Sequence, residues 1–181
     1  MVEHNVTKQN DARAISAPPR RWNEEADVVV AGYGGGAISA IEAADAGADV
    51  VILEKNPADR HICNTNVSGG IFICPTNVAK AFRYIKACVG DTVDDTLCRV
   101  WAKQTSTNTE YLKRLAESVG EPSEMIKHEG TEFPDLPGAD GISNWILKSG
   151  LGAKMFEILD KCVRDRKNIQ VAYSSPGKRG Q

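Results

Sequence analysis

The chain has 181 residues, of which 41% are hydrophobic and 25% are charged, so it can fold as one globular domain with its own core. Its 22 basic and 24 acidic residues give a net charge of −2 at pH 7, which provides no long-range attraction to nucleic acid or to an anionic membrane. No apolar run has the length of a membrane span, and the first residues lack the apolar core of a secretion signal. We therefore expect a cytoplasmic protein with no nucleic-acid partner and no membrane span.

The cysteines and histidines do not form a metal-binding pattern. The 5 cysteines are scattered and include no C-x-x-C pair, and the 3 histidines stand far apart in the sequence. We expect reduced thiols, surface or packing roles for the histidines, and no metal site. These residues are Cys63, Cys74, Cys88, Cys98 and Cys162, with His4, His61 and His128.

The domain is expected to begin after a flexible lead-in. Residues 1–25 show no hydrophobic periodicity and contain two adjacent prolines, so the domain is assigned to residues 26–181. The apolar run Val28–Ala31 predicts a strand of a parallel sheet covered on both faces. Four glycines follow almost at once, and such a cluster permits a tight turn with a phosphate close to the backbone. They are Gly32, Gly34, Gly35 and Gly36.

The stretch after these glycines has the period of a helix. Ile38 and Ile41, with small residues between and after them, predict a helix that packs closely on the sheet and ends at Gly47. The N-terminus of this helix presents free N–H groups and the positive end of its dipole to the turn. A second buried strand, residues 50–53, then leads to Glu54, whose carboxylate can accept hydrogen bonds from ribose hydroxyls.

The complete succession of these features predicts a dinucleotide site. A glycine cluster alone also fits a flexible loop or a helix cap, and an acid at a strand end also fits a solvated residue. A strand, a glycine turn, a small-residue helix, a second strand and an acid in this order favour the nucleotide interpretation. Because the acid disfavours a 2′-phosphate, the site suits the ADP-ribose of FAD or NAD better than NADP.

A second motif lies in the loop that follows. Residues 57–70 begin with a proline and are rich in small, hydrogen-bonding side chains, and a loop at the carboxyl edge of a sheet is well placed to contact a cofactor. The succession DVVVAGYGGG, AADAGADVVILEK and NTNVSGG resembles the FAD-binding domain of flavoproteins of the fumarate reductase, 3-ketosteroid dehydrogenase and urocanate reductase family. The resemblance extends from about residue 22 to residue 177.

The resemblance implies the cofactor and the residues that bind it. In this family the acid after the second strand binds the adenosine ribose, and the later motif lines the diphosphate and the flavin, which favours FAD over NAD. The cofactor-binding residues implied by the turn, the acid and the loop are Gly32, Gly34, Gly35, Gly36, Ala37, Glu54, Lys55, Asn64, Thr65, Ser68, Gly69 and Gly70.

The sequence departs from the family pattern at two places. Counted back from Glu54, Gly36 takes the place of the family's last glycine, so the turn is one residue shorter than usual. Ile62 and Cys63 stand where the family has a pair of glycines before the Asn-Thr pair. Side chains at these positions crowd a backbone that approaches the cofactor, so we expect reduced affinity for FAD.

The remaining sequence predicts further helices and strands. Expected are a short apolar segment at residues 71–73, helices at residues 79–89 and 94–119, and a last helix and strand at residues 151–166 and 169–173. The segment 121–149 contains three prolines and several glycines, which predict irregular structure or short strands. Gly120 is expected to end the long helix. Helical positions predict solvated or packing roles for Arg83, Arg99, Arg114, Arg164 and Tyr111.

The expected fold class is therefore α/β, a Rossmann-like parallel sheet with flanking helices. The resemblance implies that the strand at residues 169–173 is the third in the sheet, and that the domain is incomplete at its C-terminus, because the family's substrate domain follows this point. No catalytic residue can be assigned. The favoured hypothesis is the FAD-binding part of an oxidoreductase that acts by hydride transfer on a C=C or C–C bond of a small acid or steroid-like molecule.

Two other hypotheses stay open. One is an NAD-binding dehydrogenase domain, against which the loop at residues 64–70 argues. The other is a truncated, non-catalytic module that binds nucleotide or a partner. Because a small parallel sheet without further strands has an unpaired edge and exposed apolar surface, self-association or a partner chain is expected under this hypothesis.

Overall fold

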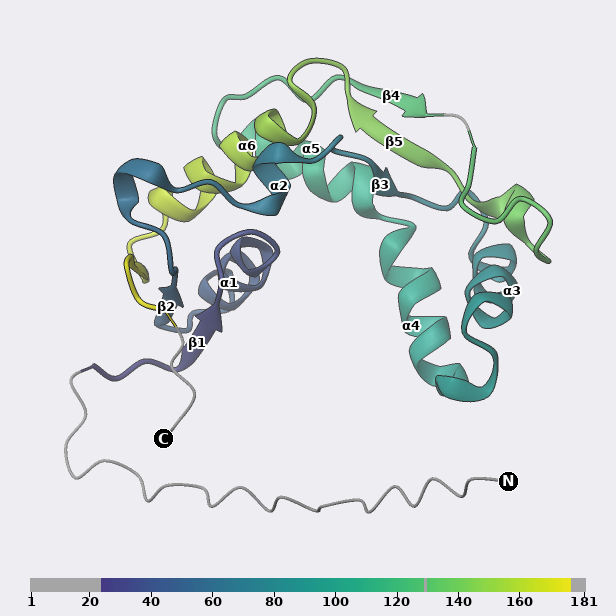
Figure 1. Cartoon of the computed structure of the whole chain (residues 1–181), viewed down its shortest axis with the longest axis horizontal. Helices are drawn as coiled ribbons and strands as arrows, with labels where there is room; N and C mark the ends of the chain where they lie inside the picture. The colour runs from purple at the N-terminus through teal and green to yellow at the C-terminus, as the bar shows by residue number, and fades with distance from the viewer. Residues whose placement is uncertain (1–23, 129, 177–181) are drawn as a thin grey trace, which may run out of the picture.

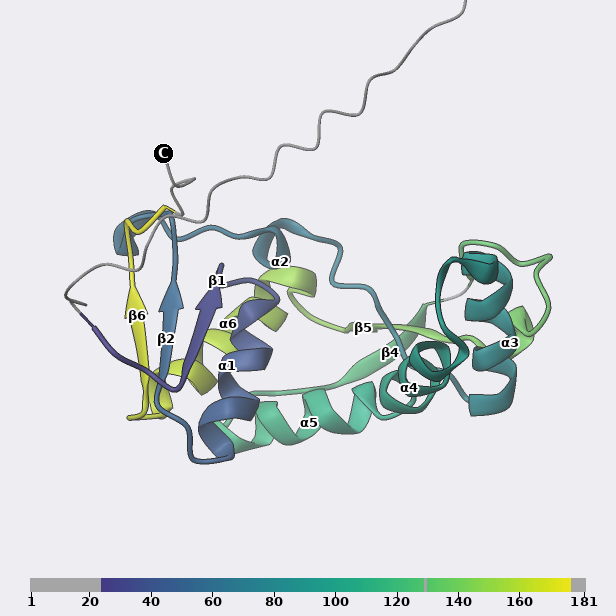
Figure 2. The same cartoon turned by 90° about the horizontal axis from the view of Figure 1, so that it is seen from below.

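The structure is a computed structural model that describes residues 24–128 and 130–176 (Figure 1). The predicted lead-in lies almost wholly outside these residues. The described chain forms an arch: one lobe holds a parallel sheet with α1 and α6, the other holds α3 and α4, and α5 with a second sheet joins them (Figures 1 and 2).

The first lobe is built on the predicted parallel sheet. Its strands β1 (Val28–Ala31), β2 (Val50–Leu53) and β6 (Ile169–Ala172) are parallel in the order β1-β2-β6, with Val29 opposite Val51 and Val51 opposite Gln170. The strand positions and the third place of β6 are thus confirmed. The helices α1 (Gly36–Asp45) and α6 (Leu151–Asp165) pack on this sheet and on each other around a common core.

Only one face of this sheet is covered by the described residues. Val30, Val50 and Ile52 are 9%, 2% and 0% exposed and belong to the core with α1 and α6. Val29, which points to the opposite face, is 61% exposed. The prediction of a strand buried on both faces is therefore wrong for β1, because an all-apolar strand does not itself supply the second layer that would bury it.

The second sheet lies at the top of the arch. Strands β3 (Phe72–Ile73), β5 (Asn144–Leu147) and β4 (Met125–His128) form an antiparallel sheet in the order β3-β5-β4. This agrees with the short strands predicted within residues 121–149. The 3₁₀ turn η3 (Ala139–Gly141) connects this region to the other lobe.

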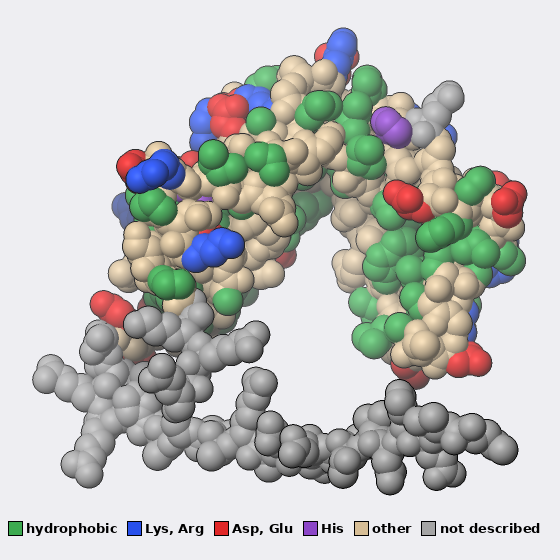
Figure 3. Space-filling model, in the orientation of Figure 1, with side chains coloured by type: hydrophobic (Ala, Val, Ile, Leu, Met, Phe, Trp, Pro, Cys, Tyr) green, Lys and Arg blue, Asp and Glu red, His purple; other side chains and the backbone are tan. Residues whose placement is uncertain are grey.

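The other lobe has a small core of its own. Helix α3 (Val78–Val89) and helix α4 (Asp95–Thr105) form a hairpin through the 3₁₀ turn η2 (Gly90–Thr92). Its core consists of Ala81, Tyr84, Ala102, Ala139 and Ile142. The space-filling view shows hydrophobic side chains gathered on this lobe (Figure 3).

The long helix predicted for residues 94–119 is two helices. Helix α4 ends at Thr105, and helix α5 (Asn108–Ser118) begins after a break of two residues. The hydroxyls of Ser106 and Thr107 donate to the carbonyls of Lys103 (2.7 Å) and Gln104 (2.9 Å). Such hydroxyls compete for the carbonyls that a continuous helix would bond, and this explains the break. Gly120 follows α5 with a φ of +69°, in line with its predicted role as a helix stop.

Two predicted properties concern the whole chain. All five cysteines are free thiols. Among the residues that the structure describes, no helix combines the length and the hydrophobicity needed to cross a bilayer.

Candidate functional site

The glycine turn after β1 is fixed by a hydrogen bond at its first residue and by close packing at its last. The N–H of Gly32 donates to the carbonyl of Leu53 at 2.8 Å, and the φ of Gly32, +88°, favours glycine. At the other end a Cβ on Gly36 would lie 2.6 Å from Cγ1 of Val30, so only glycine lets α1 approach β1 this closely. This is the packing role of the last glycine in a dinucleotide-binding turn. The turn from Gly32 to Gly36 therefore keeps this close packing with one residue fewer than the usual fingerprint.

The turn presents N–H groups at the start of α1. Within residues 24–128 and 130–176, the N–H groups of Gly34, Gly35 and Gly36 have no acceptor. They lie at the positive end of a 10-residue helix, which favours an anion there. Ala37, another predicted site residue, differs: it is fully buried, and its N–H donates to the carbonyl of Tyr33 at 2.9 Å. Its contribution is to the packing of α1.

The predicted acid lies directly beside this turn. Glu54 is only 4% exposed, and its Oε2 accepts a hydrogen bond from the N–H of Tyr33 at 3.1 Å, while Oε1 accepts one from the N–H of Asn56 at 2.8 Å. Each carboxylate oxygen can accept a second hydrogen bond. The two N–H groups thus hold the carboxylate in place and leave acceptor capacity for a ligand.

Tyr33 ties the turn to α6. Its side chain is 1% exposed, and its hydroxyl donates to Oδ1 of Asp160 at 2.7 Å. Burial, and then the bond and the charge of Asp160, raise the pKa of the Tyr33 phenol well above its ordinary value, so it stays protonated. The other oxygen of Asp160 pairs with Nε of Arg164 at 2.8 Å. The position of the glycine turn therefore depends on a residue that is 127 positions away in the sequence.

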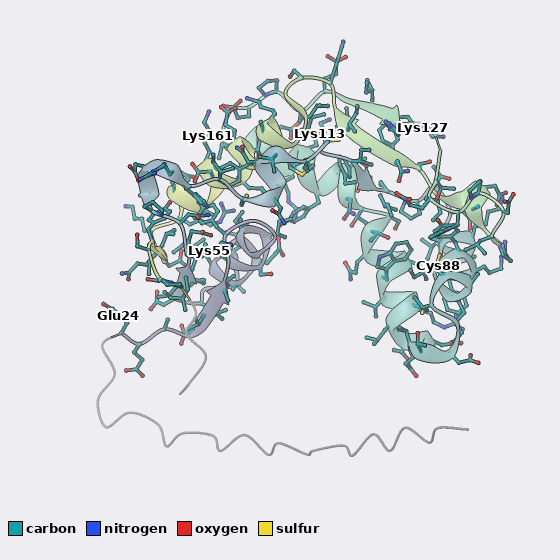
Figure 4. The ribbon with its side chains drawn as sticks, viewed as in Figure 1. Glu24, Lys55, Cys88, Lys113, Lys127 and Lys161 are labelled. Atoms are coloured by element: carbon teal, nitrogen blue, oxygen red, sulfur yellow. The ribbon has the colours of Figure 1, made fainter. Side chains whose placement is uncertain are left out.

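The turn and the acid line one cleft of about 320 Å³. Its walls also include the predicted residues Lys55, Asn64 and Thr65; Lys55 stands beside α1 in Figure 4. A Cβ on Gly34 would lie 3.3 Å from Oγ1 of Thr65 and 3.5 Å from Sγ of Cys63, so a side chain at position 34 would fill the cleft. Ile62 and Cys63, which replace the family's glycine pair, also line the cleft, and Ile62 is 60% exposed there. The cleft thus offers backbone donors for a diphosphate and a carboxylate for a sugar.

The segment Ser68-Gly69-Gly70 does not line this cleft and packs against α6 instead. Ser68 Oγ donates to the carbonyl of Thr65 at 2.9 Å and accepts from the N–H of Gly70 at 3.1 Å. A Cβ on Gly70 would lie 2.6 Å from the N of Gly152, and a Cβ on Gly152 would lie 2.3 Å from the carbonyl oxygen of Thr65. The segment therefore holds the short helix α2 (Asn64–Val67) against α6, and α2 places Asn64 and Thr65 in the cleft.

One residue beside the site was not predicted. His61 follows the 3₁₀ turn η1 (Ala58–Arg60), and its side chain is 6% exposed, with Nε2 at 3.8 Å from Oε2 of Glu54. Its ring packs against those of Tyr33, Phe156 and Tyr173. A lone histidine in a polar loop carries no periodic signal, so the sequence indicated a surface or packing role. Its position three residues before Asn64 of the Asn-Thr motif is the one signal that pointed to the cleft.

Two of the helical arginines for which solvated or packing roles are predicted pack on aromatic rings. The guanidinium of Arg99 lies over the ring of Phe82 at 4.2 Å, and that of Arg114 lies 5.0 Å from the ring of Tyr111. Neither arginine lines the cleft beside Glu54.

Solved structures share this fold. A 3-ketosteroid-Δ4-(5α)-dehydrogenase from Rhodococcus jostii RHA1 superposes with a TM-score of 0.65 at 19% identity, covering 90% of this chain and 40% of that one. A 3-ketosteroid Δ1-dehydrogenase from Sterolibacterium denitrificans gives a TM-score of 0.65 at 18% identity, over 82% and 40% of the two chains. A flavocytochrome c3 fumarate reductase gives 0.67 at 17% identity, over 84% and 27%. The chain therefore spans 40% or less of the length of these structures.

Sequence comparison gives two further matches. The digoxin reductase of Eggerthella lenta is 60% identical over 38 residues, which are 20% of this chain and 7% of that protein. The family model described as "FAD binding domain" matches residues 27–149, which is more than half of the chain and contains the glycine turn, Glu54 and α2. The chain therefore belongs to this family of FAD-binding domains, and FAD is the cofactor that the family indicates.

Proposed function

We propose that this chain holds the ADP part of FAD in a flavin-dependent oxidoreductase. The substrate class we propose is a small acid or a steroid-like molecule, whose C=C or C–C bond exchanges a hydride with the flavin. The observation that carries the proposal is the shared cleft, in which the free N–H groups of the glycine turn and the carboxylate of Glu54 lie side by side. The names of the structural neighbours, which are ketosteroid dehydrogenases and a fumarate reductase, support the substrate class.

Each part of the cleft has a role in this proposal. The N–H groups of Gly34, Gly35 and Gly36 donate to the diphosphate, and Glu54 accepts from the ribose hydroxyls. Lys55, Asn64 and Thr65 line the path of the cofactor, and Ser68, Gly69 and Gly70 remain proposed for its flavin side. Bound flavin would supply the hydride chemistry. The chain's own residues orient the cofactor and exclude water around its charged groups.

Cofactor binding by the purified chain tests this proposal. We expect FAD added to the apo-protein to bind with quenching of flavin fluorescence, and to bind more tightly than NAD or NADP at equal concentration. NAD bound more tightly than FAD would support the alternative of an NAD-binding dehydrogenase domain. Absence of binding by all three nucleotides would contradict the proposal.

The proposal extends to partners and location. Among residues 24–128 and 130–176, β1 pairs on one side only and Val29 is exposed on the uncovered face of the sheet. We therefore propose that this surface associates with a second copy or with a partner chain. Free cysteines accord with a proposed cytoplasmic location, where thiols stay reduced.

A further inference from the structure

The buried imidazole beside the ribose acceptor lacks a hydrogen-bond partner. Nε2 of His61 is buried and has no partner within residues 24–128 and 130–176. A buried polar atom without a partner destabilises the folded state, so a native structure that keeps one calls for an explanation. The carboxylate of Glu54 stands beside it, with Oε2 at 3.8 Å from Nε2. This distance is too long for a hydrogen bond and short enough for an ion pair.

We propose that His61 is a proton-controlled positioning residue of the cofactor site. When the imidazole is neutral, Glu54 keeps its free acceptor capacity for the ribose. When Nε2 takes up a proton from solvent, it becomes a donor and draws Oε2 of Glu54 into a charge-assisted hydrogen bond. The carboxylate then has one acceptor position fewer and less negative charge for the ribose. The protein releases FAD on acidification. This inference rests on the proposed function.

The surroundings of His61 are three aromatic rings. Its ring centroid lies 4.2 Å from that of Tyr33, 5.1 Å from that of Phe156 and 5.5 Å from that of Tyr173. All three pairs are T-shaped or edge arrangements, which hold the imidazole in a fixed place beside Glu54.

Asp160, the other carboxylate that faces this cluster, already has two partners. Asp160 accepts from the hydroxyl of Tyr33 and pairs with Arg164. The pKa of the Tyr33 phenol and that of the Tyr173 phenol are raised, chiefly by burial, so both stay neutral in the range where histidines titrate. Glu54, which comes from the end of β2, is thus the carboxylate that responds to His61.

The binding test follows FAD affinity from pH 8.0 to 5.5 in three proteins. The affinity of the wild type for FAD should fall about tenfold from pH 8.0 to pH 5.5, which is the effect of losing one charged hydrogen bond. His61→Gln, whose amide does not titrate, should show a constant affinity. His128→Gln is the matched control, because His128 is exposed on β4, and it should behave as the wild type. A wild type whose affinity is constant or rises in acid, or a His61→Gln variant that keeps the pH dependence, would overturn the inference.

A second measurement needs no cofactor. A double-mutant cycle of His61→Gln and Glu54→Gln, followed by denaturant unfolding, measures the coupling between the two side chains at pH 5.5 and at pH 8.0. We expect coupling of about tenfold in the folding equilibrium constant at pH 5.5 and none at pH 8.0. Equal coupling at both pH values overturns the inference even if FAD binds. Acid-dependent coupling without any FAD binding supports the contact and contradicts the proposed function instead, so the two failures are distinguishable.

Discussion

Glu54 joins three parts of the site through a single carboxylate. It accepts hydrogen bonds from the N–H of Tyr33 in the glycine turn and from the N–H of Asn56 in the loop after β2, and it faces the cleft. We predict that Glu54→Ala weakens FAD binding by about 1–3 kcal/mol, because a charged hydrogen-bond partner is removed. Isothermal titration of FAD into each protein measures this. Asp59→Ala, an exposed acid in the following loop, should bind FAD as the wild type does; equal affinity in all three proteins would contradict the role of Glu54.

Tyr33 is the residue whose hydroxyl links the turn to α6. We predict that Tyr33→Phe lowers the free energy of unfolding at pH 7 by about 0.5–1.5 kcal/mol, since one buried hydrogen bond is lost. The difference from the wild type should be largest below pH 10, the ordinary pKa of tyrosine. The folded-state pKa is raised, so the contribution of the phenol is lost as the pH rises above that value. Denaturant unfolding at pH 7, 9 and 10.5 checks this; a difference that grows above pH 10 would refute it.

The roles of some of these residues can be predicted from the sequence, and those of others cannot. Glu54 and the glycines follow from local spacing, because a strand, a turn and a helix place them within a short segment. The bond from Tyr33 to Asp160 joins residues that are 127 positions apart, and no local pattern contains it. His61 was missed for the same reason: its burial comes from Phe156 on α6 and Tyr173 after β6.

At the scale of elements, the crossing of α2 and α6 positions one wall of the cleft. Gly152 lies inside α6, and a Cβ there would meet Thr65 and Ser68 backbone or side-chain atoms at 2.3–2.6 Å. We predict that Gly152→Ala lowers the free energy of unfolding by about 1–3 kcal/mol, the usual effect of overpacking. Chemical denaturation measures it.

The control for this substitution is Gly69→Ala. A Cβ on Gly69 would meet only Cγ1 of Ile71 at 4.0 Å, an ordinary contact, so stability should change little. Alanine stabilises an isolated helix relative to glycine. If the free energy of unfolding of Gly152→Ala is unchanged or raised, α2 therefore does not pack closely on α6 at Gly152.

The elements also show where hydrophobic periodicity stops being informative. Residues 94–119 carry apolar side chains at helical spacing on both sides of the break between α4 and α5, but none between Ala102 and Tyr111. This broken stripe still predicted one helix. The break depends on the hydroxyls of Ser106 and Thr107, which bond to carbonyls of the preceding turn. Strand β1, the turn and α1 were predicted correctly because their apolar pattern, their glycines and their packing all favour the same structure.

At the scale of the whole molecule, the described part of the parallel sheet has two edge strands, β1 and β6, and one uncovered face on which Val29 is exposed. The apolar sequence of β1 predicted two covering layers, and the described residues supply one. What covers an apolar face cannot be predicted from the strand itself, because the strand's sequence is the same whether the cover is a later segment or another chain.

This surface leads to a prediction about association. We expect the wild type to elute from a size-exclusion column at increasing apparent mass as its concentration rises, because Val29 is 61% exposed beside a free strand edge. Val29→Lys should suppress this effect. Leu97→Lys, which changes a residue that is also 61% exposed but lies on helix α4, should not. A wild type that elutes as a monomer at every concentration would contradict the proposed self-association.

The strand order also affects how the protein folds during its synthesis. The middle strand β2 pairs Val51 with Gln170, and the carboxyl end of β2 bonds through Glu54 N to the carbonyl of Ala172. Contacts between such distant positions slow folding, since a long loop must close before the pairing can stabilise it. During synthesis on the ribosome, the nucleotide-binding lobe can complete its sheet only after β6 has left the exit tunnel. Until then the apolar β1 and β2 are exposed to chaperones and to neighbouring nascent chains.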